Sequence, residues 1–217
     1  MNKAYKYILF DLDGTLTDPF MGITRSVQYA LKYYGITVDD LQQLTPFIGP
    51  PLQDSFQDFY HFSQVQANEA CNKYHERFVD KGWCENVVYE GIDSFLREQK
   101  ESGKQLFVAT SKPEPLARKI LDHFNLSQYF SFIGGDTMER TRSAKAEVIR
   151  YVLSAVGITS LQEAVMIGDR KHDIIGAKSV GMDSVGVLYG YGDKQELTEA
   201  GADYIIEDVE GLRKLLL

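Results

Sequence analysis

The sequence predicts an α/β protein, in which helices cover both faces of a mostly parallel sheet and a helical segment is inserted near the N-terminus. A short apolar strand, Tyr7-Ile8-Leu9-Phe10, ends abruptly at Asp11. From residue 86 onward, apolar strand-like runs alternate with segments of helical periodicity, a pattern typical of parallel sheets with crossover helices. Residues 20–85 instead contain long helical patterns and no convincing buried strand.

The expected elements follow from this alternation. After a first strand at 5–10, further strands are expected at 105–110, 130–134, 164–168, 184–188 and, from a weaker pattern, 203–206. Helices are expected at 92–101, 113–125, 143–156, 172–180, 194–200 and just after 208. Inside the insertion, helical patterns cover 22–34 and 64–81, and "TPFIGPPL" at 45–52 interrupts them. The expected domains are therefore 1–16 with 86–217, and the insertion 17–85.

Composition narrows the classes of function. The 217 residues are 44% hydrophobic and 25% charged, and the net charge of −8 gives a pI near 5.0. This acidity argues against nucleic acid as a partner and against a basic membrane-binding patch. Two cysteines without Cys-x-x-Cys spacing do not suggest a zinc site or a disulfide framework. With no apolar signal region or membrane-length stretch, we expect a cytoplasmic protein.

Polar residues gather where the expected strands end, which is where ligands bind in open parallel sheets. Four carboxylates, two hydroxyls and two lysines are expected on this rim: Asp11, Asp13, Asp169, Asp173, Thr110, Ser111, Lys112 and Lys145. Carboxylate oxygens suit Mg²⁺, and hydroxyl groups with a lysine suit phosphoryl oxygens.

The motifs "DLDGTLTD", "VATSKP", a lysine some thirty residues later and "GDRKHD" resemble, in order, the four motifs of the haloacid dehalogenase superfamily in its phosphatase branch. Within that branch, "IGPPL", "GDRKHDIIGAK" and "GVLYGYG" are similar to the phosphoglycolate-phosphatase-like group, which includes 5′-nucleotidases. The resemblance implies a Rossmann-like core with an inserted α-helical cap domain at 17–85. It also implies a Mg²⁺-dependent phosphoric monoester hydrolase acting on a small phosphorylated metabolite, as a monomer or homodimer.

Resemblance also assigns roles to residues. Asp11 would be the nucleophile that forms an aspartyl-phosphate, and Asp13 would be the general acid and then the general base. Mg²⁺ would be held by Asp11, the main-chain carbonyl of Asp13 and Asp169. Thr110 would bind a phosphoryl oxygen, and Lys145 would neutralise charge on Asp11 and the phosphate.

Five further residues have supporting roles. Asp173 would orient Lys145 or a metal-bound water. Ser111, Lys112, Arg25 and Gly49 are candidates for substrate binding, the last two from the cap. Lys112 is expected in the first turn of a helix, with its side chain pointing outward, towards solvent or an entering substrate.

Other interpretations stay open from the sequence. Thr110 and Ser111 could cap a helix that begins at 112–113. Asp13 excludes true dehalogenases, which lack the second aspartate, and phosphonatases, which carry alanine there. A β-phosphoglucomutase-like phosphoryl transferase is a closer rival, although such enzymes usually read Glu-Asp where this chain has Gly168-Asp169. A rival from another class is a non-catalytic phospho-receiver or binding module.

Overall fold

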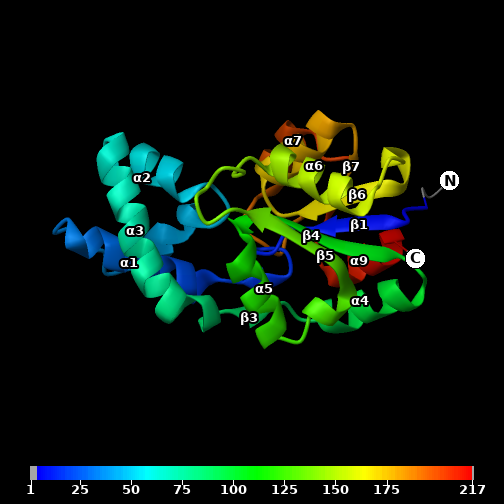
Figure 1. The fold of residues 1–217 in the computed structure, drawn as a ribbon, viewed down its shortest axis with the longest axis horizontal. Helices are drawn as coiled ribbons and strands as arrows, with labels where there is room; N and C mark the ends of the chain where they lie inside the picture. The colour runs from blue at the N-terminus through cyan, green and yellow to red at the C-terminus, as the bar shows by residue number, and fades with distance from the viewer. Residues whose placement is uncertain (1–3, 217) are drawn as a thin grey trace. The chain divides into compact units, whose positions relative to one another are not determined.

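The computed structural model describes residues 4–216, and its main feature is a six-stranded parallel sheet (Figure 1). The strand order is β5-β4-β1-β6-β7-β8. The strands are β1 Tyr7–Phe10, β4 Gln105–Pro113, β5 Phe130–Asp136, β6 Ala164–Gly168, β7 Asp183–Val187 and β8 Tyr204–Ile206. The α/β fold class expected from the sequence is confirmed.

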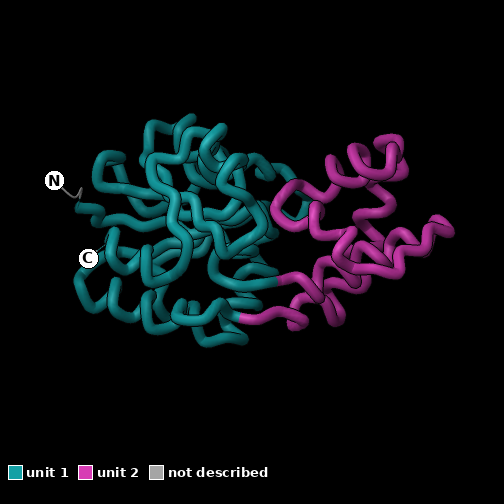
Figure 2. Tube along the Cα trace, turned by 180° about the vertical axis from the view of Figure 1, so that it is seen from behind, with its two compact units in different colours: residues 1–18, 88–217 teal, residues 19–87 magenta. Residues whose placement is uncertain are grey.

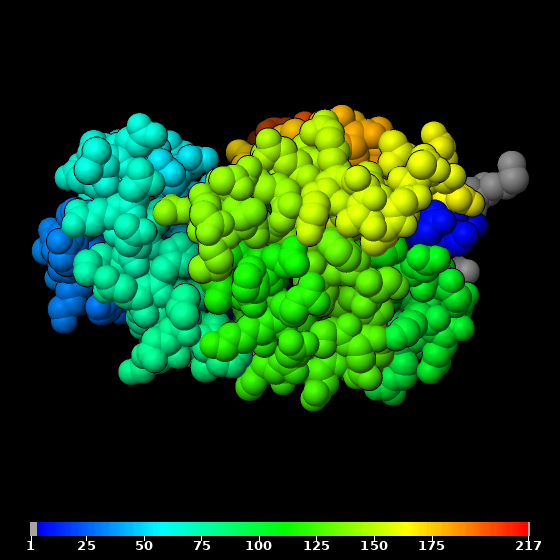
Figure 3. Space-filling model, in the orientation of Figure 1, coloured from blue at the N-terminus to red at the C-terminus, as the bar shows by residue number. Residues whose placement is uncertain are grey.

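The first strand lies in the middle of the sheet, which explains its continuous apolar sequence. Ile8, Leu9 and Phe10 are fully buried. In the space-filling view, the dark blue atoms of the N-terminal residues form one patch beside the yellow segment (Figure 3). Phe10 pairs with Val108 of β4 on one side and with Ile167 of β6 on the other. This register aligns the carboxyl ends of the three strands.

Helices cover both faces of this sheet. They are α4 Ile92–Glu101, α5 Glu114–His123, α6 Lys145–Val156, α7 Lys171–Val180, α8 Lys194–Ala200 and α9 Val209–Leu216. Helices α6 and α7 lie on one face, with α4 and α9 on the other (Figure 1). Under α6 and α7, Leu9, Phe107 and Met166 of the strands pack with Val148 and Val152 in one apolar layer. This burial holds the strand ends at fixed positions.

The expected helix start after β4 is wrong. Strand β4 continues to Pro113 and α5 begins at Glu114, so Lys112 lies in a strand. A residue that precedes proline is disfavoured in the helical conformation, which keeps Lys112 extended. The capping role considered for Thr110 and Ser111 is therefore also wrong, because the residue before α5 is Pro113, which has no capping side chain.

The chain divides into two compact units, one formed by residues up to 18 with those from 88 onward, the other by 19–87 (Figure 2). The second unit contains α1 Phe20–Tyr33, α2 Leu52–Tyr60 and α3 Gln64–Asp80, with the short 3₁₀ helices η1 Leu41–Phe47 and η2 Gly82–Cys84. Two short strands, β2 Thr17–Asp18 and β3 Val87–Val88, pair where the chain passes between the units. These limits differ by two residues at each end from the expected 17–85.

Aromatic packing explains α2, which the sequence did not predict. Phe56 of α2 is fully buried, and its ring lies 5.0 Å from that of Phe47 and 5.9 Å from that of Phe62. The helix has only nine residues and directly follows the proline-containing segment 45–52, which hides it in the sequence although its apolar residues have helical spacing: Leu52, Phe56, Phe59 and Tyr60. Across residues 4–216, no helix is both long enough and apolar enough to cross a membrane.

A carboxylate within the second unit links its first and third helices. Glu85 accepts hydrogen bonds from Arg77 at 2.8 and 3.0 Å and from Arg25 at 3.0 Å. The hydrogen bonds from Arg77 are the largest influence on the pKa of Glu85, and with Arg25 they lower it below its ordinary value of 4.5. The pairing therefore stabilises the folded unit above pH 4.5, and this contribution is lost as the pH falls through the lowered pKa.

We predict that Glu85→Gln lowers the free energy of unfolding at pH 7 by about 1 kcal/mol. The difference from the wild type should shrink as the pH falls below 4.5, because both side chains are then uncharged. Fluorescence of Trp83, the single tryptophan and a member of η2, reports the transition of this unit in urea. Asp39→Asn, at an exposed position of the same unit, is the control. A difference that does not change with pH would contradict the charge-based explanation.

Candidate active site

Carboxylates and lysines meet at the carboxyl ends of the three central strands. Asp11 directly follows β1, Asp169 directly follows β6, and Thr110 lies near the end of β4. Asp11, Asp169 and Thr110 are each less than 7% exposed. The sheet register that aligns Phe10 with Val108 and Ile167 thus brings residues from distant parts of the sequence to one place.

Lys145 is the centre of a buried ion-pair network. Its Nζ lies 2.8 Å from Asp11 Oδ1 and 2.8 Å from Asp173 Oδ1, and it donates to the carbonyl of Ala109 at 3.0 Å. Burial alone would lower the pKa of Lys145, but the attraction of Asp11 and Asp173 raises it overall. The side chain is therefore a permanent ammonium beside Asp11.

A close helix–helix approach directs this lysine. Lys145 is the first residue of α6, and its aliphatic stem packs on Gly176 of α7, where an added Cβ would lie 2.9 Å from Lys145 Cγ. Asp173, in the first turn of α7, also accepts a hydrogen bond from the Arg170 backbone N–H at 3.1 Å. Asp173 therefore orients Lys145 while capping its own helix.

Asp11, Asp169 and Asp173 form a group that could hold a metal ion. One carboxylate oxygen from each lies within 4.8 Å of the others, and all three residues are buried. Burial, with repulsion from Asp173 and Asp11, raises the pKa of Asp169 well above its usual range. A divalent cation would offset this concentration of charge, and carboxylate oxygens are the ligands that Mg²⁺ prefers. The donor set therefore fits the ion expected from the sequence.

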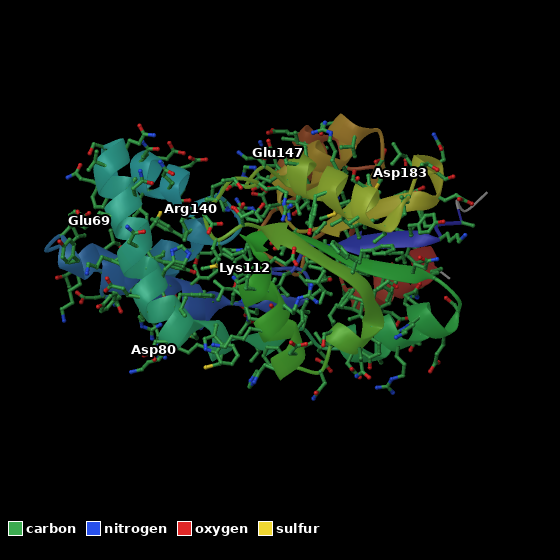
Figure 4. The ribbon with its side chains drawn as sticks, in the orientation of Figure 1. Glu69, Asp80, Lys112, Arg140, Glu147 and Asp183 are labelled. Carbon is green, nitrogen blue, oxygen red and sulfur yellow. The ribbon has the colours of Figure 1, made fainter. Side chains whose placement is uncertain are left out.

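The second lysine pairs with the second aspartate. Lys112 Nζ lies 2.5 Å from Asp13 Oδ2, and the two side chains are 6% and 13% exposed. Burial raises the pKa of Asp13, and Lys112 acts against this. Lys112 therefore does not point into solvent: from its place near the carboxyl end of β4 (Figure 4) its side chain reaches Asp13, and its contact with an entering substrate stays a prediction. Asp13 Oδ1 is buried and accepts no hydrogen bond within residues 4–216.

The hydroxyls expected at this rim have partners on neighbouring segments. Thr110 Oγ1 accepts a hydrogen bond from the Lys112 backbone N–H at 3.2 Å. Ser111 Oγ donates to the Ser143 carbonyl at 3.1 Å, which ties β4 to the loop that leads to Lys145. Ser111 therefore anchors that loop, whereas the Thr110 hydroxyl donates no hydrogen bond within residues 4–216.

The two candidates from the insertion belong to the second compact unit. Arg25 lies on α1 and pairs with Glu85 at 3.0 Å. Gly49 has φ +106°, a conformation that side chains rarely adopt, in the turn after η1. Their contact with a substrate stays a prediction.

Several residues that shape the site were missed by the sequence analysis. Asp136 is buried and accepts hydrogen bonds from the Thr137 and Arg142 backbone N–H groups and from Ser143 Oγ, at 2.7, 2.9 and 2.6 Å. It thereby orders the loop before Lys145. The Tyr191 backbone N–H donates to Asp169 Oδ2 at 2.8 Å. Tyr191 lies in the motif "GVLYGYG", which the sequence analysis singled out, but the spacing of its residues alone gives that motif no role.

The haloacid dehalogenase-like hydrolase family model matches residues 8–187. A 5′-nucleotidase of Pseudomonas aeruginosa is 45% identical, over 98% of this chain and 96% of its own length. The tyrosine-protein kinase PtkA of Mycobacterium tuberculosis is 37% identical over 88% of this chain, and 64% of its own length is covered. The crystal structure of a predicted phosphatase from Clostridium acetobutylicum has a TM-score of 0.94 and 46% identity, covering 97% of each chain.

The family model spans most of the sequence, including the segments that carry Asp11, Thr110, Lys145 and Asp169. The relative named as a 5′-nucleotidase and the phosphatase structure are both similar over nearly the whole chain. The resemblance seen in the four motifs is confirmed. The chain belongs to the haloacid dehalogenase-like hydrolase family, in its phosphatase branch.

Proposed function

We propose that this protein is a Mg²⁺-dependent phosphatase that hydrolyses small phosphate monoesters through an aspartyl-phosphate on Asp11. The observation that carries the proposal is the buried network in which Lys145 bridges Asp11 and Asp173, beside Asp169. Burying three carboxylates is costly unless a reaction or a cation uses them. Phosphoryl transfer to a carboxylate uses them in this way.

The proposed roles follow from the contacts of each side chain. Asp11 attacks the phosphorus atom, its P–O bond forms, and the bond to the leaving alcohol breaks. Asp13 gives that alcohol a proton and later takes one from the water that attacks the phosphorus of aspartyl-phosphate. In this second step the bond between the Asp11 oxygen and phosphorus breaks, which releases inorganic phosphate and regenerates the Asp11 carboxylate. Lys145 remains an ammonium that neutralises Asp11 and the phosphoryl oxygens. The Thr110 hydroxyl donates a hydrogen bond to one of those oxygens.

The proposed metal ligands are Asp11, Asp169 and the main-chain carbonyl of Asp13. When bound there, Mg²⁺ would reduce the repulsion between the carboxylate nucleophile and the anionic phosphate. Asp173 would contribute by orienting Lys145, because its Oδ1 is 2.8 Å from the ammonium.

A spatial constraint disfavours the phosphoryl transferase alternative. Transferases of that group usually carry glutamate where this chain has Gly168, and a Cβ at Gly168 would lie 2.2 Å from Asp173 Cγ. A side chain at this position would displace Asp173 and with it Lys145. Membership of a hydrolase family likewise argues against a non-catalytic receiver module.

For the substrate we propose phosphoglycolate or a nucleoside monophosphate. The 5′-nucleotidase that is 45% identical over nearly its full length supports the nucleotide, and the group resemblance in the sequence supports phosphoglycolate. We also propose that the protein is cytoplasmic and acts as a monomer or homodimer. The test is turnover of para-nitrophenyl phosphate with and without Mg²⁺, followed by a panel of phosphoglycolate, nucleoside monophosphates, sugar phosphates and pyrophosphate. No turnover of any member with Mg²⁺ would contradict the proposal.

Asp11→Asn should abolish turnover while the fold is kept, because an amide is not nucleophilic towards phosphorus. We expect at least a thousandfold loss of kcat on para-nitrophenyl phosphate, on the order of losing a covalent nucleophile. Asp122→Asn, an exposed aspartate of α5, is the control and should keep full activity. A folded Asp11→Asn protein with a tenth of the wild-type activity would contradict the covalent mechanism.

Asp13→Ala should slow poor leaving groups much more than good ones. A general acid contributes about 10²–10⁴-fold when the departing alkoxide is basic, and far less for nitrophenolate. Lys112→Met, which removes the partner of Asp13, should show the same dependence on the leaving group to a smaller degree. The measurement is kcat/KM on an alkyl phosphate and on para-nitrophenyl phosphate. Equal losses on both substrates would show that Asp13 only shapes the site.

Lys145→Ala should lower kcat by about a hundredfold or more, the scale of removing one preorganised charge stabiliser. The loss should be the same for good and poor leaving groups, because Lys145 contacts the nucleophile and not the leaving oxygen. Lys214→Ala, at an exposed position of α9, is the matched control. A larger loss of kcat from Lys112→Met than from Lys145→Ala would overturn the assignment of Lys145.

A further inference from the structure

The loop between β7 and α8, residues 188–193, has no role in the function derived so far. It contains the sequence Leu-Tyr-Gly-Tyr-Gly-Asp, here called the tyrosine loop. Four of its residues lie against segments of the active site within the first compact unit: Tyr189, Gly190, Tyr191 and Gly192.

The loop lies directly on Asp169. The Tyr191 backbone N–H donates to Asp169 Oδ2 at 2.8 Å, while Thr15 Oγ1 donates to Asp169 Oδ1 at 3.3 Å. Both carboxylate oxygens are therefore oriented by neutral donors, which add no positive charge beside Asp169. Each oxygen has a second lone pair for a cation.

The two glycines allow this close approach. A Cβ at Gly190 would lie 2.3 Å from the Gly14 carbonyl oxygen and 2.4 Å from Asp169 Cβ. A Cβ at Gly192 would lie 2.0 Å from the Asp169 carbonyl oxygen. Side chains at either position would push the loop away from Asp169 and remove the bond from Tyr191 N–H.

The same loop is attached to the segment that follows Asp13. The Tyr191 hydroxyl donates to Asp18 Oδ1, and the Tyr189 hydroxyl donates to the Thr15 carbonyl at 3.0 Å. The Tyr189 ring also packs edge-on against Tyr89, with 5.0 Å between ring centroids. Tyr191 is thus fixed at both ends, by its backbone to Asp169 and by its hydroxyl to Asp18.

We propose that Tyr191 is a positioning residue that fixes Asp169 relative to the turn carrying Asp11 and Asp13, and so sets the affinity for Mg²⁺. The inference rests on the magnesium site proposed above. Groups that orient a metal-binding carboxylate typically contribute 10–100-fold to metal affinity. The hydroxyl of Tyr191 acts at one step removed, so we expect a loss of about tenfold.

The test measures Mg²⁺ binding directly, by isothermal titration of MgCl₂ into the purified protein without substrate. Tyr191→Phe keeps the ring and removes only the bond to Asp18, and it should raise the Kd for Mg²⁺ about tenfold. Tyr129→Phe is the matched control, because the Tyr129 hydroxyl bonds to Asp93 at 2.8 Å, a bond of the same kind that joins η3 Ser127–Tyr129 to α4. The control should bind Mg²⁺ like the wild type.

Variants of the partner give a second measurement. Asp18→Asn keeps an oxygen that accepts the tyrosine hydroxyl and should bind Mg²⁺ nearly as well as the wild type, whereas Asp18→Ala should weaken binding as much as Tyr191→Phe. The double variant Tyr191→Phe/Asp18→Ala should be no worse than either single one, because both remove the same bond. In activity assays, excess Mg²⁺ should restore the kcat of Tyr191→Phe with an unchanged KM for para-nitrophenyl phosphate.

The possible outcomes separate this inference from the proposed function. Wild-type protein that hydrolyses phosphate esters and binds Mg²⁺, with Tyr191→Phe binding it equally well, would overturn the role of Tyr191 alone. Equal weakening by Tyr191→Phe and Tyr129→Phe would overturn it too, by showing a general effect on stability. Wild-type protein that binds no Mg²⁺ would contradict the proposed metal site and this inference together.

Discussion

The arrangement of the active site depends on one buried cation, the ammonium group of Lys145. It lies 2.8 Å from a carboxylate oxygen of Asp11 and 2.8 Å from one of Asp173, in a place almost without solvent. Without it, two carboxylates would be buried next to each other and next to Asp169, an arrangement that costs several kcal/mol. The position of Lys145 in turn depends on Gly176, which lets α6 and α7 approach closely enough for the stem to pass.

The two lysines divide the charge of the site between them. Lys145 pairs with the residue proposed to take the phosphoryl group, and Lys112 with the residue proposed to move protons. This division keeps Asp11 and Asp13 in different electrostatic surroundings although only Leu12 separates them. Two neighbouring carboxylates take different roles when their environments differ in this way.

The placement of three of the four motifs could be predicted from the sequence, because each of these three lies at the end of a strand with a strong local pattern. Asp11, Asp169 and Thr110 are examples, since a buried strand directly precedes or contains them. Lys112 could not be placed, because Ser-Lys-Pro fits both a helix start and the end of a strand. Tyr191 could not be assigned, because its role depends on a contact with Asp169 that only the tertiary fold creates. Helix α2 was missed for a different reason: its apolar residues have helical spacing, but it spans only nine residues directly after the prolines of segment 45–52.

The position of β1 has a consequence for how the chain folds. Tyr7 is synthesised long before Gln105 and Ala164, its two neighbours in the sheet. The apolar strand Tyr7–Phe10 therefore stays without its partners until β4 and β6 have left the ribosome, and closing such long loops is slow. An exposed apolar strand of this kind promotes aggregation. During biosynthesis the nascent chain thus passes through an interval in which it benefits from chaperones. This interval ends when β6 docks against β1.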